Sequence, residues 1–172
     1  MPSSHPEFVS TICAELIRLG PDSLLDVGCG NGKWGFLARE YMDVYRARWA
    51  RDKQSRIDAI EIFEEYDSEL LRAIYSNVYI GDALEVLPTL GHYDAAVCGD
   101  MLEHLPRDAG ERLLGLLTEH CEVAWVTTPV KWFPSRDWFG NEAERHRELW
   151  TAEQLGYYGE VITGEVLHLL TL

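Results

Sequence analysis

The stretch that decides the fold runs from Leu24 to Gly35 and reads LLDVGCGNGKWG. It begins with a short apolar run that carries one acid, and four glycines follow within eight residues. Glycine loses more backbone entropy on folding than any other residue, and a simple turn needs only one. Several glycines between a short strand and the start of a helix indicate a ligand that lies against the backbone.

On both sides of this stretch, short apolar runs alternate with segments of helical spacing. The expected strands are 24–27, 57–62, 77–80, 93–98, 123–127, 159–163 and 165–170. The expected helices are 6–19, 33–45, 66–75, a short one ending at Leu87, 107–119 and one near 151–155. This alternation predicts an α/β three-layer sandwich with a seven-stranded, mostly parallel sheet. The last two strands are joined at Gly164 alone, so they must form an antiparallel C-terminal hairpin.

Length and composition limit the class of protein. The chain of 172 residues predicts a single domain over 1–172, with an N-terminal helix inside 1–20. Its net charge of −14 disfavours nucleic acid and anionic membranes as partners. The N-terminus resembles no secretory signal, and no apolar stretch approaches the about 20 residues of a membrane span. Four widely spaced cysteines indicate reduced thiols, so we expect a cytoplasmic protein.

Two classes of ligand fit the glycines. Gly30-x-Gly32-x-x-Gly35 matches the dinucleotide fingerprint, so an NAD(P)-dependent oxidoreductase is one alternative. Three details differ from that fingerprint. The loop already starts at Gly28, an acid (Asp26) lies within the strand, and the next strand-end acid follows Gly30 by 31 residues. In the dinucleotide fingerprint, the corresponding acid follows the glycines by only about 20 residues.

A second family shares these details. The stretch DVGCGNG (26–32) resembles the first motif of class I S-adenosylmethionine (SAM)-dependent methyltransferases. The resemblance continues in order through AIEI (59–62), GDA (81–83) and GDMLEHLP (99–106), and covers nearly the whole chain. It implies a Rossmann-like fold and methyl transfer from SAM to oxygen or nitrogen of a small-molecule acceptor. A non-catalytic SAM- or nucleotide-binding regulatory module is a further alternative.

The resemblance also implies which residues bind SAM. They are Asp26, Gly28, Gly30, Gly32, Glu61, Ile62, Asp82, Ala83, Asp100 and Met101. Glu61 would accept the ribose hydroxyls, although it could also be a solvated strand-end charge. Asp82 would meet the adenine amine, or cap the following helix, or both. Asp26 would tie the loop through backbone N–H groups or neutralise the ammonium of the cofactor.

The sulfonium of SAM already activates its methyl group, so the protein has to position an acceptor and remove a proton where needed. His104 is the best single candidate for the base because of its ordinary pKa, and a structural histidine is the alternative. We assign no metal to the site. One further reading is that Asp100, Glu103 and His104 resemble the metal-binding stretch of ubiquinone-pathway O-methyltransferases, where a Glu stands in place of Asp100.

Two further segments bear on the acceptor. Segment 128–150 is long and aromatic, so we expect a substrate lid or wall, with His146 or Arg147 as a base or anion clamp. Aromatic residues that simply cover the sheet edge are the alternative. Segment 41–56 is locally basic, and we expect a solvated helix extension rather than a docking patch. The chain carries no cap domain, so a second subunit could complete the site in a homodimer.

Overall fold

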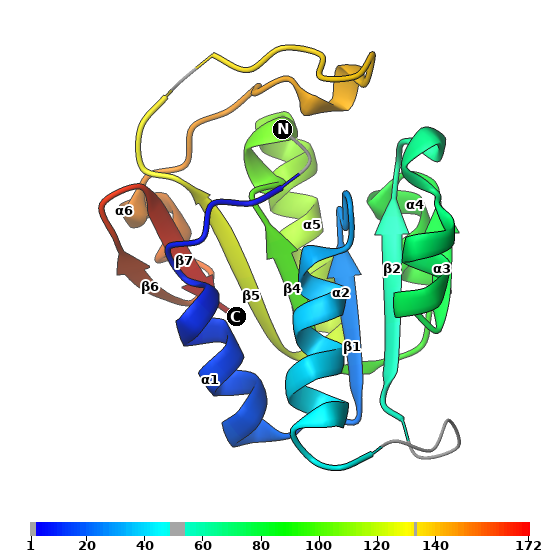
Figure 1. Ribbon diagram of the computed structural model, residues 1–172. Helices are drawn as coiled ribbons and strands as arrows, with labels where there is room; N and C mark the ends of the chain where they lie inside the picture. Colours follow the sequence, from blue (N-terminus) through cyan, green and yellow to red (C-terminus); the bar gives the residue numbers. More distant parts are fainter. Residues whose placement is uncertain (1–2, 49–53, 133) are drawn as a thin grey trace.

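The computed structural model describes residues 3–48, 54–132 and 134–172. Across these residues one seven-stranded sheet has the order β3-β2-β1-β4-β5-β7-β6 (Figure 1). The strands are β1 Ser23–Val27, β2 Arg56–Glu61, β3 Asn77–Ile80, β4 Tyr93–Gly99, β5 Cys121–Pro129, β6 Glu160–Thr163 and β7 Leu167–Thr171. Strand β7 runs antiparallel to both β5 and β6, and the pairs among β1 to β5 are parallel. The predicted fold class is therefore confirmed.

Helices cover both faces of this sheet. The α-helices are α1 Val9–Leu19, α2 Lys33–Ala38, α3 Glu69–Ile74, α4 Ala83–Val86, α5 Arg107–His120 and α6 Ala152–Leu155. Helices α1, α2 and α3 pack on one face, and α4, α5 and α6 pack on the other (Figure 1). None of the described helices is long and apolar enough to cross a membrane.

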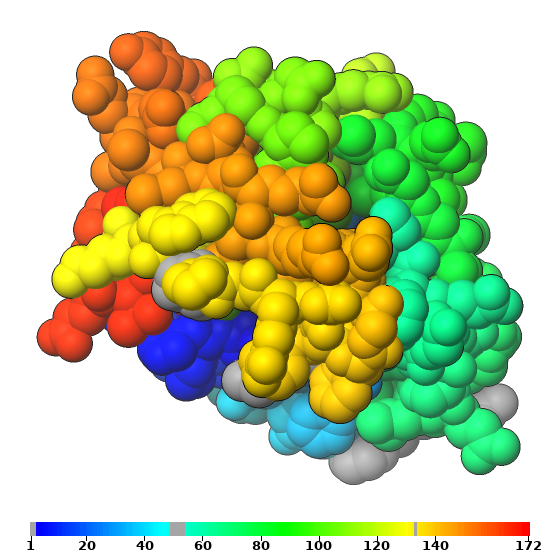
Figure 2. Space-filling model, turned by 90° about the horizontal axis from the view of Figure 1, so that it is seen from above, coloured from blue at the N-terminus to red at the C-terminus, as the bar shows by residue number. Residues whose placement is uncertain are grey.

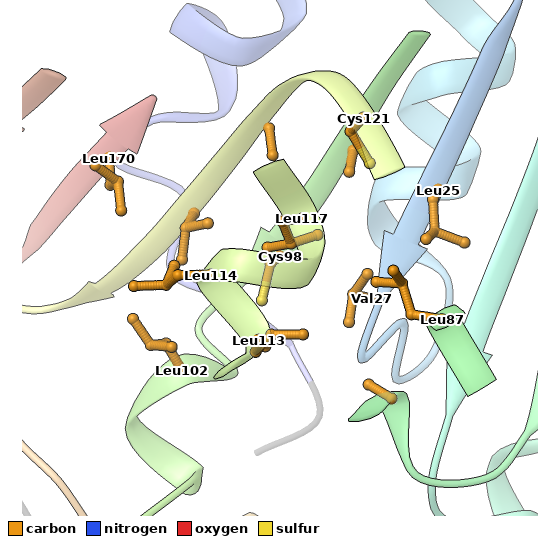
Figure 3. Packing of buried hydrophobic residues seen from close by; sticks show 14 of the residues in the cluster. Leu25, Val27, Leu87, Cys98, Leu102, Leu113, Leu114, Leu117, Cys121 and Leu170 are labelled. Carbon is orange, nitrogen blue, oxygen red and sulfur yellow. The ribbon is translucent and has the colours of Figure 1, made fainter. Parts of the chain in front are cut away.

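The strands at the centre of the sheet are apolar because both of their faces are buried, whereas the edge strands β3 and β6 are partly exposed. In β1, Leu24 packs into the core under α1 to α3, whereas Leu25 and Val27 pack into the core under α4 and α5. Figure 3 shows the second of these cores, where Leu113 and Leu117 of α5 lie close to the strands. A parallel sheet that is covered on both sides favours such continuous apolar runs over alternating ones.

Several predicted elements differ in extent from the observed ones: the predicted helix 33–45, for example, is an α-helix only over Lys33–Ala38 and continues as a π-helix over Arg39–Val44. The structure gives a reason for two of the differences. The predicted helix 66–75 starts only at Glu69, because the Ser68 hydroxyl accepts the N–H of Leu71 and caps it. The predicted strand 165–170 starts at Leu167, because the backbone N–H groups of 165–167 donate to the Glu7 carboxylate instead. A tertiary contact with a residue near the N-terminus thus sets the start of the last strand.

Two arginines of the basic segment 41–56 form contacts that stabilise the fold. The Arg46 guanidinium donates to the carbonyl oxygens of Gly20 and Ile17, at the end of α1. Arg48 forms an ion pair with Asp22, with 2.7 Å between nitrogen and oxygen. Residues 49–53 of this segment lie outside the described part of the chain. These contacts support a structural role for the two arginines over a docking patch.

Candidate active site

A cavity of about 290 Å³ lies at the edge of the sheet where the parallel strands end. In Figure 1 this is the upper edge, and segment 134–150 arches above it. Figure 2 views this face from above and shows the same segment lying across it. Open α/β sheets bind ligands at this edge, outside the carboxyl ends of the strands. The cavity wall comes from residues 3–4, 28–30, 33–34, 60–62, 81–83, 99–101, 104–106, 141, 143–144 and 147.

The glycine loop borders the cavity and turns the chain from β1 into α2. Gly28, Gly30 and Gly32 have φ values of 75°, 52° and 86°, which favour glycine strongly. The Gly28 N–H donates to the carbonyl oxygen of Ile60 at 2.9 Å, so the loop rests against β2. Gly28 and Gly30 line the cavity, but Gly32 does not. A Cβ at Gly32 would approach the Leu71 side chain to 2.7 Å, so this glycine serves helix packing.

Glu61 lies at the end of β2 and on the cavity wall, with only 4% of its surface exposed. One carboxylate oxygen accepts the Gly30 N–H at 2.8 Å, and the other accepts the Phe63 N–H at 3.0 Å. Burial raises the pKa of this carboxyl above its ordinary value. Glu61 is therefore a buried acid that holds the glycine loop, rather than a solvated charge. Its exposed neighbour Ile62 also lines the cavity.

Asp82 and Ala83 form the next part of the wall, beyond β3. One oxygen of Asp82 accepts the Leu84 N–H at 2.8 Å and caps α4. The predicted capping role is therefore confirmed. Contact with adenine stays a prediction, which the cap does not exclude because a carboxylate has about four acceptor positions.

Asp100 and Met101 line the cavity beyond β4. Asp100 adopts a φ of 53°, which is uncommon for a residue with a side chain. Its carboxylate accepts the Thr127 hydroxyl at 2.6 Å and the His5 N–H at 2.7 Å. Burial is the main reason why its pKa lies above the ordinary value. These bonds hold the carboxylate at the cavity wall.

Asp26 lies behind the glycine loop and does not line the cavity. It is fully buried and accepts a hydrogen bond from the Tyr75 hydroxyl, which in turn accepts the Gly35 N–H. Burial is the main cause that raises its pKa to about 7. Asp26 is thus linked to the start of α2 through Tyr75, and its contact with the ammonium of the cofactor stays a prediction.

His104 and His146 come together although 42 residues separate them. Their ring centroids are 4.9 Å apart with an interplanar angle of 77°. His104 lines the cavity, and His146 does not. Burial, and then the neighbouring His146, lower the pKa of His104 to about 4. His104 is therefore neutral at pH 7 and a weaker base than its ordinary pKa predicts.

Glu103 lies beside this histidine pair and is 2% exposed. Its carboxylate accepts the Thr128 hydroxyl at 3.1 Å, and burial raises its pKa well above the ordinary value. One ligand atom from each of Glu103, His104 and His146 lies within 4.8 Å of the other two. These three residues could hold a metal ion. The predicted set differs, because it contains Asp100 and lacks His146.

Sequence reasoning missed several residues of the cavity wall. Ser3 and Ser4 reach it from the N-terminus, and Lys33 donates from the start of α2 to the carbonyl oxygen of Ser4. Trp34 is 4% exposed, and its indole N–H has no partner among the described residues. A buried donor without a partner at a cavity fits a ligand with acceptor atoms. Its place directly after the glycines is the signal that could have identified it.

The segment 128–150 contributes the remaining wall residues, among them Asn141, Glu144 and Arg147. Glu144 accepts a hydrogen bond from the Tyr66 hydroxyl at 3.2 Å, which ties this segment to the β2 side of the cavity. The predicted wall residue Arg147 is therefore at the cavity, whereas Phe133 lies outside the described part of the chain. The segment therefore contributes to the cavity wall, but through polar and small residues. None of its described aromatic residues lines the cavity, so the expectation of an aromatic wall is wrong for these residues.

The fold and cavity define a Rossmann-like protein with a ligand cavity beside its glycine loop. Residues 6–159 match a methyltransferase domain family, and the chain belongs to that family. It is a SAM-dependent methyltransferase, and S-adenosylmethionine is its cofactor. The oxidoreductase and the non-catalytic module are not favoured by this membership.

Solved structures agree with this fold. A SAM-dependent methyltransferase from Archaeoglobus fulgidus has a TM-score of 0.60 and 20% identity, over 87% of this chain and 66% of that one. The 1,6-didemethyltoxoflavin-N1-methyltransferase of Burkholderia thailandensis has a TM-score of 0.66 and 15% identity, over 96% of this chain and 76% of that one. The magnesium protoporphyrin IX methyltransferase of Synechocystis, with bound SAM, has a TM-score of 0.62 and 15% identity, over 97% of this chain and 78% of that one. No curated protein matches the sequence.

Proposed function

We propose that this chain transfers the methyl group of SAM to an oxygen or nitrogen atom of a small-molecule acceptor. The observation that carries this proposal is one continuous cavity, whose wall extends from Glu61 at the end of β2 to His104 and Arg147. Such a wall offers a cofactor end and an acceptor end. Two of the similar structures are named for small-molecule acceptors, a toxoflavin precursor and magnesium protoporphyrin IX.

The cofactor nucleoside would lie on the side of β2 and β3. Glu61 accepts two backbone N–H groups, and two acceptor positions remain on its carboxylate for the ribose hydroxyls. Gly28 and Gly30 allow the ligand to approach the backbone, since a side chain at either place would need a strained φ. Ile62, Asp82 and Ala83 would contact the adenine.

The methionine end of the cofactor would lie near Asp100. A fixed carboxylate at the cavity wall suits an ammonium group, and Met101 adds apolar surface. The unpartnered indole N–H of Trp34 is a donor for the cofactor carboxylate. Both charges of the methionine end would then have a buried partner, as buried charges require.

SAM supplies a methyl group that its sulfonium already activates. The remaining work of the protein is to orient the acceptor in line with the breaking bond and to exclude water. Segment 128–150 would do this as the wall of the acceptor end, and Arg147 would attract an anionic acceptor. His104 lines the cavity, and we propose that it receives the proton of the acceptor, with His146 packed against its ring.

Calorimetric titration of the purified chain with S-adenosylhomocysteine, and separately with NAD⁺, tests this proposal. We expect S-adenosylhomocysteine to bind, and Glu61→Ala to raise its Kd by about 10- to 100-fold through the loss of charged hydrogen bonds. Glu64→Ala is the matched control, because Glu64 is exposed and outside the cavity wall. Binding of NAD⁺ without binding of S-adenosylhomocysteine would contradict the proposed function.

A further inference from the structure

Segment 128–150 is joined to the β2 side of the cavity by a hydrogen bond between two buried side chains. Tyr66 is 8% exposed, and its hydroxyl donates to the Glu144 carboxylate at 3.2 Å. Glu144 lines the cavity together with Asn141 and Ala143, whereas Tyr66 does not line it. The Tyr66 hydroxyl can therefore act on a ligand only through the residues that it holds.

The turn that carries Tyr66 also fixes the acid at the end of β2. In the turn Glu64–Tyr66, the Tyr66 N–H donates to the Phe63 carbonyl oxygen at 3.0 Å. The rings of Phe63 and Tyr66 lie edge to face, with centroids 4.9 Å apart. The Phe63 N–H in turn donates to the Glu61 carboxylate. Burial raises the pKa of Glu61, and the nearby Glu144 carboxylate raises it further. The two acids are therefore neighbours at the cavity.

The Tyr66 hydroxyl is suited to hold one of these acids in place. Burial, and then the Glu144 carboxylate, raise its pKa to about 12, so the hydroxyl keeps its proton at neutral pH. Two neighbouring carboxylates repel each other, and this repulsion alone would favour a Glu144 side chain turned toward water. A hydrogen bond to a carboxylate is stronger than one between neutral groups. The bond from Tyr66 thus opposes the repulsion and keeps Glu144 beside Glu61.

We propose that Tyr66 is a positioning residue for the cofactor, which holds residues 141–144 over the nucleoside end of the cavity. This inference rests on the proposed function, which places the ribose at Glu61. Figure 2 shows the yellow and orange segment beside the blue-green chain that follows β2. Segment 128–150 would therefore close over the cofactor as well as over the acceptor, because it also supplies Arg147 to the cavity wall.

The two ends of this closure have separate attachments. At the acceptor end, the backbone N–H groups of residues 147–148 donate to the Glu103 carbonyl oxygen at 2.8 Å and 3.1 Å. At the nucleoside end, the attachment is the bond between Tyr66 and Glu144. Loss of the Tyr66 hydroxyl should loosen residues 141–144 and leave the acceptor end attached. The cofactor would then leave faster, because its release no longer requires this bond to break.

The Tyr66→Phe variant tests the proposal, because it removes the hydroxyl and keeps the ring that packs on Phe63. Surface plasmon resonance of the immobilised full chain measures the association and dissociation rates of S-adenosylhomocysteine. We expect the dissociation rate and the Kd to rise by about 10-fold, as for the loss of a hydrogen bond to a charged group. The association rate should change by less than about 3-fold, since most changes in affinity lie in dissociation.

Tyr93→Phe is the matched control. It also removes a buried hydroxyl that donates to a carboxylate, that of Asp58 at 2.8 Å, but neither residue lines the cavity. This control should leave both rates unchanged. Hydrogen exchange of the ligand-free chains gives a readout that needs no cofactor. Tyr66→Phe should speed the exchange of residues 141–145, and Tyr93→Phe should not, because only the first bond holds this segment.

A double-mutant cycle tests whether Tyr66 acts through Glu144. In a Glu144→Ala background, Tyr66→Phe should change the dissociation rate by less than about 2-fold, because the bond is already lost. Circular dichroism checks that each variant is folded. If Tyr66→Phe does not fold, Glu144→Ala removes the same bond from the other side and should raise the dissociation rate in its place.

Two results would overturn the positioning role alone, provided that the native chain binds S-adenosylhomocysteine. One is an unchanged dissociation rate in Tyr66→Phe, and the other is an equal effect of Tyr66→Phe and Tyr93→Phe. Failure of the native chain to bind S-adenosylhomocysteine is a different outcome. It would overturn the proposed function, and the positioning role with it.

Discussion

Asp26 illustrates how a motif residue can work from behind the site. The motif that resembles SAM-dependent methyltransferases places an acid before the glycines, and its side chain is entirely buried beside Tyr75. The second carboxylate oxygen has no hydrogen-bond partner among the described residues. Ionisation of this buried carboxyl costs free energy, because water solvates the charge better than the protein interior does.

The stability of the chain should therefore depend on this carboxyl. Its pKa is about 7 in the folded protein and about 3.8 when unperturbed, so the folded state binds the proton more tightly. The contribution of Asp26 to the free energy of unfolding is greatest when the pH is below its unfolded-state pKa. It falls as the pH rises from there toward the pKa of the folded state. The side chain of the Asp26→Asn variant cannot ionise. As the pH rises from 5 to 8, the free energy of unfolding of this variant should therefore increase by up to about 3 kcal/mol relative to that of the native chain. Urea unfolding at several pH values measures this, and a difference that is independent of pH would contradict it.

At the scale of elements, α5 and the end of segment 128–150 depend on one close contact. Trp150 is 1% exposed, and the Arg107 guanidinium lies 3.9 Å from its ring centroid. A Cβ at Gly110 of the same helix would approach the Trp150 ring to 2.6 Å. Gly110 thus allows the helix to lie against the tryptophan that anchors the cavity wall.

Two alanine substitutions in α5 separate this contact from helix propensity. Gly115→Ala meets no atom within 4 Å and should stabilise the chain by about 0.5–1 kcal/mol, as alanine does in helices. Gly110→Ala gains the same propensity but has to displace Trp150, so it should destabilise by about 1–3 kcal/mol. Urea unfolding of both variants gives the comparison. An equal change in the free energy of unfolding at the two positions would show that Trp150 does not pack closely against Gly110.

For the whole molecule, the site exists only because separate segments meet over one edge of the sheet. The N-terminal residues, the glycine loop, the turn after β4 and segment 128–150 all contribute to one cavity. A ligand that bridges these segments binds the folded state and not the unfolded chain. Its binding free energy therefore adds to the stability of the whole fold.

Thermal unfolding with ligand present tests this coupling. S-adenosylhomocysteine at 100 times its Kd should stabilise the chain by about 2.7 kcal/mol. For a chain of this size the Tm should rise by about 5–10 °C. NAD⁺ at the same concentration is the control and should leave Tm unchanged. A larger shift with NAD⁺ than with S-adenosylhomocysteine would count against the class of cofactor. The predicted cytoplasmic location and homodimer stay predictions.

Local pattern was sufficient for the fold, and most of the residues predicted to bind the cofactor line the cavity. Apolar runs, helical spacing and the glycines of 28–35 depend on neighbouring residues, so the strands and the loop could be predicted without tertiary contacts. Glu61 and Asp82 were predicted from the resemblance of their motifs to SAM-dependent methyltransferases, and both lie at the cavity because the ends of parallel strands reach the same edge of the sheet. Their detailed hydrogen bonds to Gly30 and Leu84 were beyond such reasoning.

The acceptor side depends on contacts between residues that are distant in the sequence. The pairing of His104 with His146, the N-terminal wall and the unpartnered Trp34 appear only when the chain is folded. The low pKa of His104 has the same origin, since burial and a neighbouring ring cause it. Sequence spacing defines which residues are available, but desolvation and long-range packing define their charge and their partners.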